Sequence, residues 1–216
     1  VENAYRDVNI AFANELSMVA DKMGLDVWEV IRLANRHPRV NILQPGPGVG
    51  GHCIAVDPWF IVAGAPDETP LIRTARNVND GKMHHVVKKA AELVEANPGM
   101  KVACLGLAFK ANIDDFRESP ARYVAASLAR QFGSRINVVE PYAGQLPREF
   151  EGTGAVQIDL DTALEECGVL IVLVDHDVFK VIPLAERSGK VVYDTRGIWP
   201  DQPGAESPAA GLRLAS

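Results

Sequence analysis

The second half of the chain, residues 99–200, alternates short apolar runs with helix-like segments. The apolar runs are KVACLGLAF, INVVEPY, GVLIVLVDH and KVVYDTRG, which begin at Lys101, Ile136, Gly168 and Lys190. Runs this short and this rich in β-branched residues are typical of buried strands. Strands that alternate with helices need crossover connections, and these produce a parallel sheet. The pattern predicts an α/β fold for this half, with helices over residues 120–132, 160–166 and 178–187.

The first half has helical periodicity instead. Helices are predicted over residues 1–23, 27–35, 53–63 and 71–96, because apolar residues recur there at helical spacing. Gly24 is suited to end the first helix, and Asp26 to cap the second. Asn97-Pro98-Gly99 reads as a turn between the halves. The predicted organisation is a helical domain over 1–98, an α/β domain over 99–200 and a flexible tail over 201–216.

Charge and composition exclude several classes of function. The net charge is −6 and no long run of Lys and Arg occurs, which argues against nucleic acid or an anionic membrane surface as partner. No apolar stretch is long enough to span a bilayer, and no signal peptide is recognised. Three cysteines at unrelated spacings predict a reducing, cytoplasmic location and no disulfide framework. No Cys/His spacing predicts a metal site.

The residues at the carboxyl ends of the expected strands indicate where a ligand would bind. In open parallel sheets, ligands bind outside the carboxyl ends of the strands. Those ends carry Phe109-Lys110, Glu140, Asp175-His176 and Asp194–Arg196. Lys110 and Arg196 are suited to an anionic ligand. Ordinary charges on the rim of the sheet are the alternative, and the sequence leaves both open.

The loop PGPGVGGHCIAVDPWF, residues 45–60, has several interpretations. It follows a helix rather than a strand and matches neither G-x-G-x-x-G nor the P-loop. Its glycines could simply turn the chain around a packed thiol, as Cys104 is expected to pack inside its strand. Alternatively, Cys53 begins a helix whose dipole lowers the thiol pKa, with Asp57 one turn further on the same face and able to act on a water molecule.

Four motifs in order carry a family resemblance. They are ENAYRDVNIAFANEL, PGPGVGGHCIAVDPWF, GLAFKANIDDFRESPA and YDTRGIW. Over residues 1–200 the chain resembles the UDP-glucose/GDP-mannose dehydrogenase family. That family combines an NAD-binding Rossmann domain, a central helical dimerisation domain and a C-terminal Rossmann-like domain for the nucleotide sugar. The resemblance covers the last two, so the NAD domain and a catalytic lysine are expected upstream of Val1, and the chain is expected to be inactive alone.

The resemblance also implies roles for individual residues. It implies Cys53 as nucleophile, Asp57 as its partner and Asn3 as a residue facing the reacting sugar carbon. Arg117 is implied on the side of the NAD cofactor. Arg39 is implied to reach the substrate of a neighbouring subunit, within a homodimer formed through the N-terminal helices. The implied substrate-binding residues are Arg39, Leu43, Gly46, Gly48, Gly50, Gly51, Phe109, Lys110 and Arg196.

His52 and Val56 bear on the substrate. UDP-glucose and GDP-mannose oxidisers usually have Ser and Lys there, and the form in this chain is similar to the N-acetylhexosamine branch. The implied reaction oxidises UDP-N-acetyl-D-mannosamine to the uronate with two NAD+ through a thioester on Cys53, for surface polysaccharide synthesis. UDP-glucose or another UDP-N-acetylhexosamine remains an alternative substrate. A non-catalytic UDP-sugar-binding and dimerisation module, or a bare scaffold, remains an alternative function.

Overall fold

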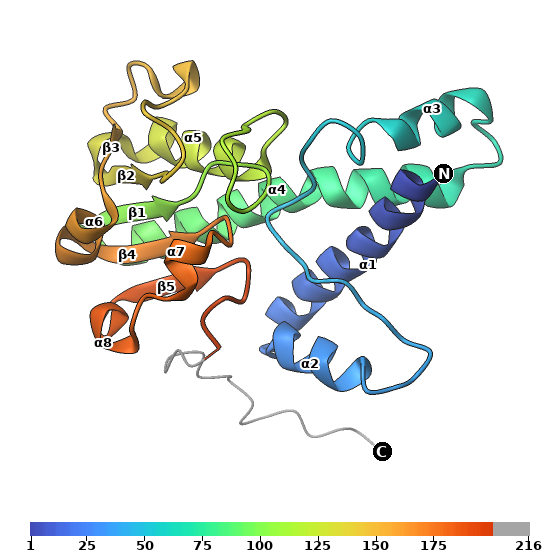
Figure 1. The fold of residues 1–216 in the computed structure, drawn as a ribbon, viewed down its shortest axis with the longest axis horizontal. Coiled ribbons are helices and arrows are strands. Elements are labelled where there is room, and N and C mark those ends of the chain that lie inside the picture. Colours follow the sequence, from blue (N-terminus) through green and yellow to red (C-terminus); the bar gives the residue numbers. More distant parts are fainter. Residues whose placement is uncertain (201–216) are drawn as a thin grey trace.

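The computed structural model describes residues 1–200, so the predicted tail over 201–216 lies outside the described residues. The helical half contains α1 (Glu2–Met23), α2 (Val27–Ala34), α3 (Asp57–Gly64) and α4 (Pro70–Ala96). α1 packs against α4, and α3 lies beside the start of both helices (Figure 1). Gly24 ends α1 in the left-handed conformation, with φ 66°. The Asp26 carboxylate caps α2 by accepting the N–H groups of Trp28 and Glu29.

The second half is a five-stranded sheet in which every pairing is parallel. Its strands are β1 (Lys101–Leu105), β2 (Ile136–Val139), β3 (Val156–Gln157), β4 (Cys167–Val172) and β5 (Val191–Asp194). The strand order is β3-β2-β1-β4-β5, and the predicted α/β class is confirmed. The two-residue β3 was not predicted, because so short a strand leaves no periodic signal. Short 3₁₀ turns cover Gly133–Arg135 (η1) and Arg148–Phe150 (η2).

Helices cover both faces of the sheet. One core places Val102 and Cys104 of β1 against α5 (Pro120–Phe132) and the second half of α4. The other places Ala103 and Leu105 against α6 (Leu160–Glu166) and the Phe179 ring. Alternate residues of β1 therefore enter opposite cores, as buried parallel strands require. Because α4 packs on α1 at one end and on α5 at the other, this helix joins the two halves of the chain (Figure 1).

Two predicted helices were wrong in extent. The helix predicted over 53–63 begins only at Asp57, so Cys53 precedes it. The helix predicted over 178–187 is divided into α7 (Asp177–Lys180) and α8 (Leu184–Arg187). Pro183 separates them, because proline lacks an N–H group and disfavours helical geometry in the residue before it. Across residues 1–200, no helix combines the length and the apolar character needed to cross a membrane.

Candidate active site

The carboxyl edge of the sheet meets the glycine loop. Pro47 and Gly48 of the loop, Phe109 after β1, Asp175 after β4 and Arg196 after β5 line a pocket of about 20 Å³. Residues that follow β1, β4 and β5 therefore meet the glycine loop, whereas a ligand crevice at this place stays a prediction. Lys110, the other predicted cation, follows Phe109 in the chain and is exposed.

Arg196 is held against the loop by charge and by shape. Its Nη2 lies 2.9 Å from Asp175 Oδ1, and both side chains are partly exposed. Its backbone N–H donates to Asp194 Oδ1 at 2.8 Å, which fixes the turn after β5. A Cβ on Gly46 would lie 2.4 Å from Arg196 Nη1, so only glycine leaves room for the guanidinium there. The guanidinium is thus held beside the glycine loop, and its contact with an anionic ligand stays a prediction.

The other side of the loop is fixed by a buried amide network. The Gly46 N–H donates to Asn14 Oδ1 at 2.9 Å, and Asn14 Nδ2 donates to Asn79 Oδ1 at 2.9 Å. Asn79 Nδ2 in turn donates to Asp7 Oδ1 at 2.8 Å, and Arg76 Nη1 lies 2.6 Å from the same oxygen. Burial raises the pKa of Asp7, although the Arg76 charge opposes that shift. Sequence reasoning missed this network, whose only signal was polar residues on the buried face of an amphipathic helix.

Cys53 lies in a turn rather than in a helix. It is exposed, and its carbonyl accepts the N–H groups of Val56 at 3.1 Å and Asp57 at 2.8 Å. The predicted placement of Cys53 in the first turn of a helix is therefore wrong, and with it the helix-dipole argument for its thiol. Asp57 is still brought next to Cys53, but by this turn instead of by helical periodicity.

Asn3 joins the same neighbourhood from α1. Its Nδ2 donates to Asp57 Oδ2 at 2.6 Å, and both residues are partly buried. The start of α1 thereby meets the start of α3 (Figure 1). The three residues expected to be catalytic are brought together, since Cys53 and Asp57 share a turn and Asn3 holds the carboxylate. What role each plays stays a prediction.

The segment between β1 and α5 closes onto the glycine loop. A Cβ on Gly51, whose φ is 86°, would lie 2.9 Å from the Phe109 ring. The Gly51 N–H also donates to the Arg117 carbonyl at 3.3 Å. Hydrogen bonds from the Arg117 guanidinium, including Nη2 to Oδ2 at 2.5 Å, lower the pKa of Asp115 to about 2. Phe109 and Arg117 are therefore fixed on the segment that meets the loop before Cys53.

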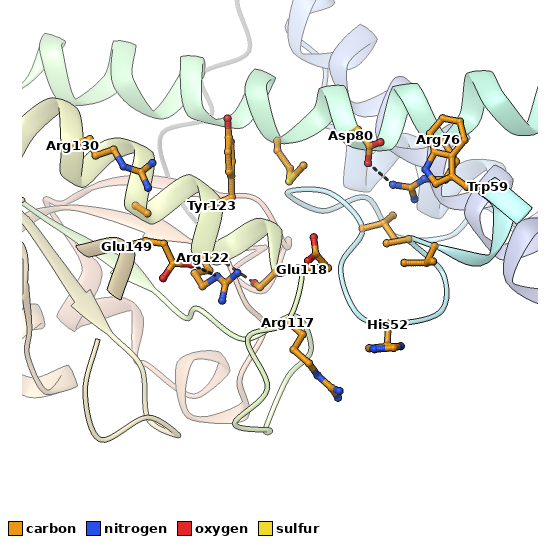
Figure 2. Close-up of a pocket in the computed structure, with 16 residues that line it drawn as sticks. His52, Trp59, Arg76, Asp80, Arg117, Glu118, Arg122, Tyr123, Arg130 and Glu149 are labelled. Atoms are coloured by element: carbon orange, nitrogen blue, oxygen red, sulfur yellow. Dashed lines mark hydrogen bonds and ion pairs between the residues drawn. The ribbon is translucent and has the colours of Figure 1, made fainter. Parts of the chain in front are cut away.

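A wider cleft of about 580 Å³ lies beside the cysteine loop. His52 of the loop and Arg117 face the same open space (Figure 2). Along the cleft the Arg122 guanidinium pairs with Glu149 at 3.2 Å, and Tyr123 adds an aromatic wall. The Arg117 side chain is 66% exposed, so its guanidinium keeps donors free for a ligand. The cleft therefore combines an exposed cation and an aromatic ring beside the cysteine loop.

Two predicted residues are not brought into the crevice by any contact. Arg39 is exposed and Leu43 is partly buried, both on the segment between α2 and the glycine loop. Within residues 1–200, no hydrogen bond or ion pair joins the Arg39 side chain to another candidate residue. Cys104 is fully buried, and burial raises the pKa of its thiol to about 12, which fits the packed thiol expected there.

Comparison with known proteins identifies the family. The profile of the UDP-glucose/GDP-mannose dehydrogenase central domain matches residues 1–81, and the profile of its UDP-binding domain matches residues 103–201. A UDP-N-acetyl-D-mannosamine dehydrogenase of Salmonella typhi is 56% identical over 206 residues, covering 92% of this chain and 49% of the relative. An NDP-N-acetyl-D-galactosaminuronic acid dehydrogenase of Ralstonia solanacearum is 52% identical over 92% of this chain and 46% of its own length.

The solved structures agree. The UDP-D-ManNAc dehydrogenase of Pyrococcus horikoshii superposes with a TM-score of 0.77 at 33% identity, over 94% of this chain and 48% of that one. The chain thus spans about half the length of the relatives it matches. The two profiles and the shared fold cover both halves of the molecule. This chain belongs to the UDP-glucose/GDP-mannose dehydrogenase family.

Proposed function

We propose that this chain supplies the cysteine loop and the sugar-nucleotide crevice of an NAD-dependent UDP-N-acetyl-D-mannosamine 6-dehydrogenase. The observation that carries the proposal is the junction of Cys53, Asp57 and Asn3 at the end of a glycine loop whose earlier residues line a pocket with Arg196. A thiol in the same turn as a carboxylate, on a loop that also reaches an arginine, is suited to chemistry on one end of a phosphorylated ligand. A nucleotide sugar has that form, with phosphates at one end and a primary alcohol on the sugar.

The chemistry requires four electrons to leave one carbon. The alcohol loses a hydride and a proton to give an aldehyde, and the Cys53 thiolate adds to that aldehyde to form a thiohemiacetal. Loss of a second hydride and proton gives a thioester. Water then cleaves the C–S bond, which releases the carboxylate and regenerates the thiol. The covalent bond to Cys53 prevents the aldehyde from escaping midway.

Asp57 and Asn3 are placed to assist these steps. The Asn3 amide holds one oxygen of the Asp57 carboxylate, which leaves the other oxygen to accept a proton from an attacking water molecule. The second N–H of the same amide can donate to the oxygen that becomes negative as the thiolate or the water adds. A positioned carboxylate and a positioned donor fit hydrolysis of a thioester.

The NAD cofactor fits this chain at one point. Among residues 1–200, the first strand is followed by Gly106-Leu107-Ala108 rather than by a dinucleotide fingerprint, so the cofactor's main site would come from elsewhere. Arg117, exposed in the 580 Å³ cleft near His52, would hold part of an anionic dinucleotide beside the cysteine loop. When bound, NAD+ supplies the acceptor for the hydrides. We infer that a dinucleotide-binding segment completes the enzyme and that this chain alone does not turn over.

A dimer is the proposed assembly. Tyr5, Phe12 and Val19 recur every seven residues on α1 and are 70%, 58% and 47% exposed. An exposed apolar stripe at that spacing is suited to a second copy of the same helix. In such a dimer, Arg39 would be free to reach the partner's crevice, since it makes no contact with its own.

A binding module is the second candidate function. It is favoured by the match to the central and UDP-binding domains together with the span of about half of each relative. Titration calorimetry with UDP and uridine on the 216-residue chain tests whether the crevice binds nucleotide at all. No binding of UDP would contradict both candidates.

The stoichiometry of NADH separates the candidates. Absorbance would follow NADH per nucleotide sugar for the complete gene product with UDP-N-acetyl-D-mannosamine, UDP-N-acetyl-D-glucosamine and UDP-glucose. Two NADH per UDP-N-acetyl-D-mannosamine, with little from the others, is the expected result. Two NADH from another sugar would instead assign that substrate. Binding of UDP with no NADH from any sugar would leave the binding module.

A further inference from the structure

The segment from Gly106 to Glu118 carries three of the candidate ligand-binding residues. Phe109 and Lys110 lie near its start and Arg117 near its end. It belongs to no helix or strand, so its conformation depends on contacts with other parts of the molecule. One such contact is the glycine loop, which it meets at Gly51. The remaining contacts lie underneath it, at the carboxyl ends of β2 and β4.

Glu140, at the end of β2, holds the first part of the segment. Its side chain is buried, and Oε2 accepts the N–H groups of Leu107 at 2.6 Å and Ala108 at 3.2 Å. Oε1 accepts the Tyr142 N–H at 2.9 Å. Burial alone would raise the pKa of Glu140, but His176 and these N–H groups outweigh it and lower that pKa. Both oxygens are therefore occupied within the protein, and Glu140 is not available to bind a ribose.

His176, after β4, holds the next part. It is fully buried, with Nε2 lying 3.4 Å from Glu140 Oε2. Its Nδ1 accepts the backbone N–H of Asn112 at 2.9 Å. Because Nδ1 is an acceptor, the ring proton lies on Nε2 and faces the glutamate. The ring is packed between Tyr142 and Phe179, with centroids at 5.0 and 5.3 Å.

Asn112 is the point on which these contacts converge. Its φ of 62° is left-handed, a conformation that non-glycine residues rarely adopt. Its side-chain Nδ2 donates to Asp177 Oδ2 at 2.7 Å, and its Oδ1 accepts from the Tyr142 hydroxyl at 3.2 Å. Lys110 lies only two residues before this fixed point. The contacts of Asn112 therefore constrain the backbone two residues after Lys110.

We propose that His176, backed by Glu140, is a positioning residue for nucleotide binding. Its Nδ1 fixes the Asn112 backbone and so places Lys110 against the phosphates of the ligand. His176 itself touches no ligand, because its side chain is fully buried. The inference rests on the proposed function in one respect, namely that the ligand of the crevice is a nucleotide diphosphate.

Two substitutions test the roles of the two ring nitrogens of His176 separately. His176→Asn keeps an acceptor near the position of Nδ1, whereas His176→Gln keeps a donor near that of Nε2 and loses the acceptor. Calorimetry on the 216-residue chain would measure Kd for UDP and for uridine, which has no phosphates. His176→Gln is expected to weaken UDP binding about 10-fold and uridine binding less than 2-fold, as loss of one charge-assisted contact would. His176→Asn is expected to retain most of the UDP affinity.

A double-mutant cycle tests whether the effect passes through Lys110. In the Lys110→Ala background, His176→Gln should cause no further loss of UDP affinity. His85→Gln, on a histidine that pairs with Asp21 in the helical half, is the control. Additive losses, or equal losses of UDP and uridine affinity in both His176 variants, would overturn the proposal and leave a structural role only.

Hydrogen exchange provides a test that needs no ligand. Amides of residues 109–115 should exchange faster in His176→Gln than in His176→Asn, and equal rates would overturn the positioning role. If neither variant folds, nitrogen NMR of the unchanged chain decides, because protonation of Nδ1 would contradict the contact with Asn112. If the unchanged chain binds no UDP, the proposed function fails. Hydrogen exchange and nitrogen NMR then still test whether His176 positions residues 109–115, because neither measurement needs a ligand.

Discussion

Replacing the buried Lys82 with methionine should stabilise the protein at neutral pH. Lys82 lies on α4, is 4% exposed, and its Nζ donates to the Ser17 hydroxyl of α1 at 2.7 Å. Burial lowers the pKa of Lys82 from 10.5 to about 8, against the opposing charge of Asp21. A buried ammonium with one neutral partner is costly, and an unbranched apolar side chain of similar length fills the same space.

The magnitude follows from that shift. At pH 7 Lys82 is charged in both states, and a difference of 2.5 pH units between 10.5 and 8 corresponds to a penalty of about 3 kcal/mol. Loss of the bond to Ser17 offsets about 1 kcal/mol. Lys82→Met is therefore expected to raise the free energy of unfolding by about 2 kcal/mol at pH 7. Lys89→Met, on a half-exposed lysine 3.5 Å from Asp21, should change it by less than about 0.5 kcal/mol.

The pH dependence identifies the cause. Between pH 8 and 10.5 the unfolded state binds more protons at this lysine than the folded state does, so its contribution to stability rises with pH. The advantage of Lys82→Met should shrink by about 2 kcal/mol between pH 7 and pH 10. The Cys104 thiol has the opposite effect on stability above pH 9, because burial raises its pKa in the folded state to about 12 and it then ionises only in the unfolded state. Both proteins contain Cys104, so subtracting the stability curve of one protein from that of the other cancels this effect.

Urea unfolding followed by circular dichroism would measure both proteins from pH 7 to 10. A Lys82→Met protein that is less stable than the unchanged chain at pH 7 would refute the reasoning. So would an advantage that stays constant with pH, because the gain would then come from packing and not from removal of a charge.

Three further predictions concern the site. Cys53→Ser should abolish formation of the acid while UDP affinity by calorimetry stays within about 2-fold; normal turnover would contradict the covalent scheme. Lys110→Ala should weaken UDP binding about 10-fold, as loss of a charge-assisted contact does, and an unchanged Kd would remove Lys110 from the site. Gly46→Ala should displace the Arg196 guanidinium and weaken UDP binding by a similar factor. If Gly46→Ala retained full affinity, Arg196 would not contact the ligand in its present position.

Local signals predicted the elements that depend on neighbouring residues. Asp26 caps α2, and Ser119 caps α5 by accepting the Arg122 N–H, because a cap needs only side chains and backbone a few residues apart. The strand pattern likewise predicted the parallel sheet, since the central strands β1, β2 and β4 are buried on both faces. These features were visible because their physical cause lies within one short stretch of sequence.

Long-range polar contacts could not be predicted in this way. Asn14 looks like one polar residue in an amphipathic helix, and its partner Asn79 lies 65 positions away on α4. His176 was noted only as a strand end, since nothing local shows that Asn112 returns to its ring. The helix at Cys53 was misplaced for a related reason. Apolar periodicity continues backward from α3, but the Asp57-Pro58 pair marks where the helix actually begins.

The glycine loop shows why these misses coincide with the site. Gly46 adjoins the Arg196 guanidinium and Gly51 adjoins the Phe109 ring, so both glycines allow side chains of the other half to approach the loop closely. The amide of Gly46 is already bonded to Asn14 and is not free for a phosphate. Packing and internal hydrogen bonds therefore account for Gly46 and Gly51, and contacts between this loop and a ligand stay a prediction. These glycines lie where the two halves of the chain approach each other closely, and no single stretch of the sequence shows that approach.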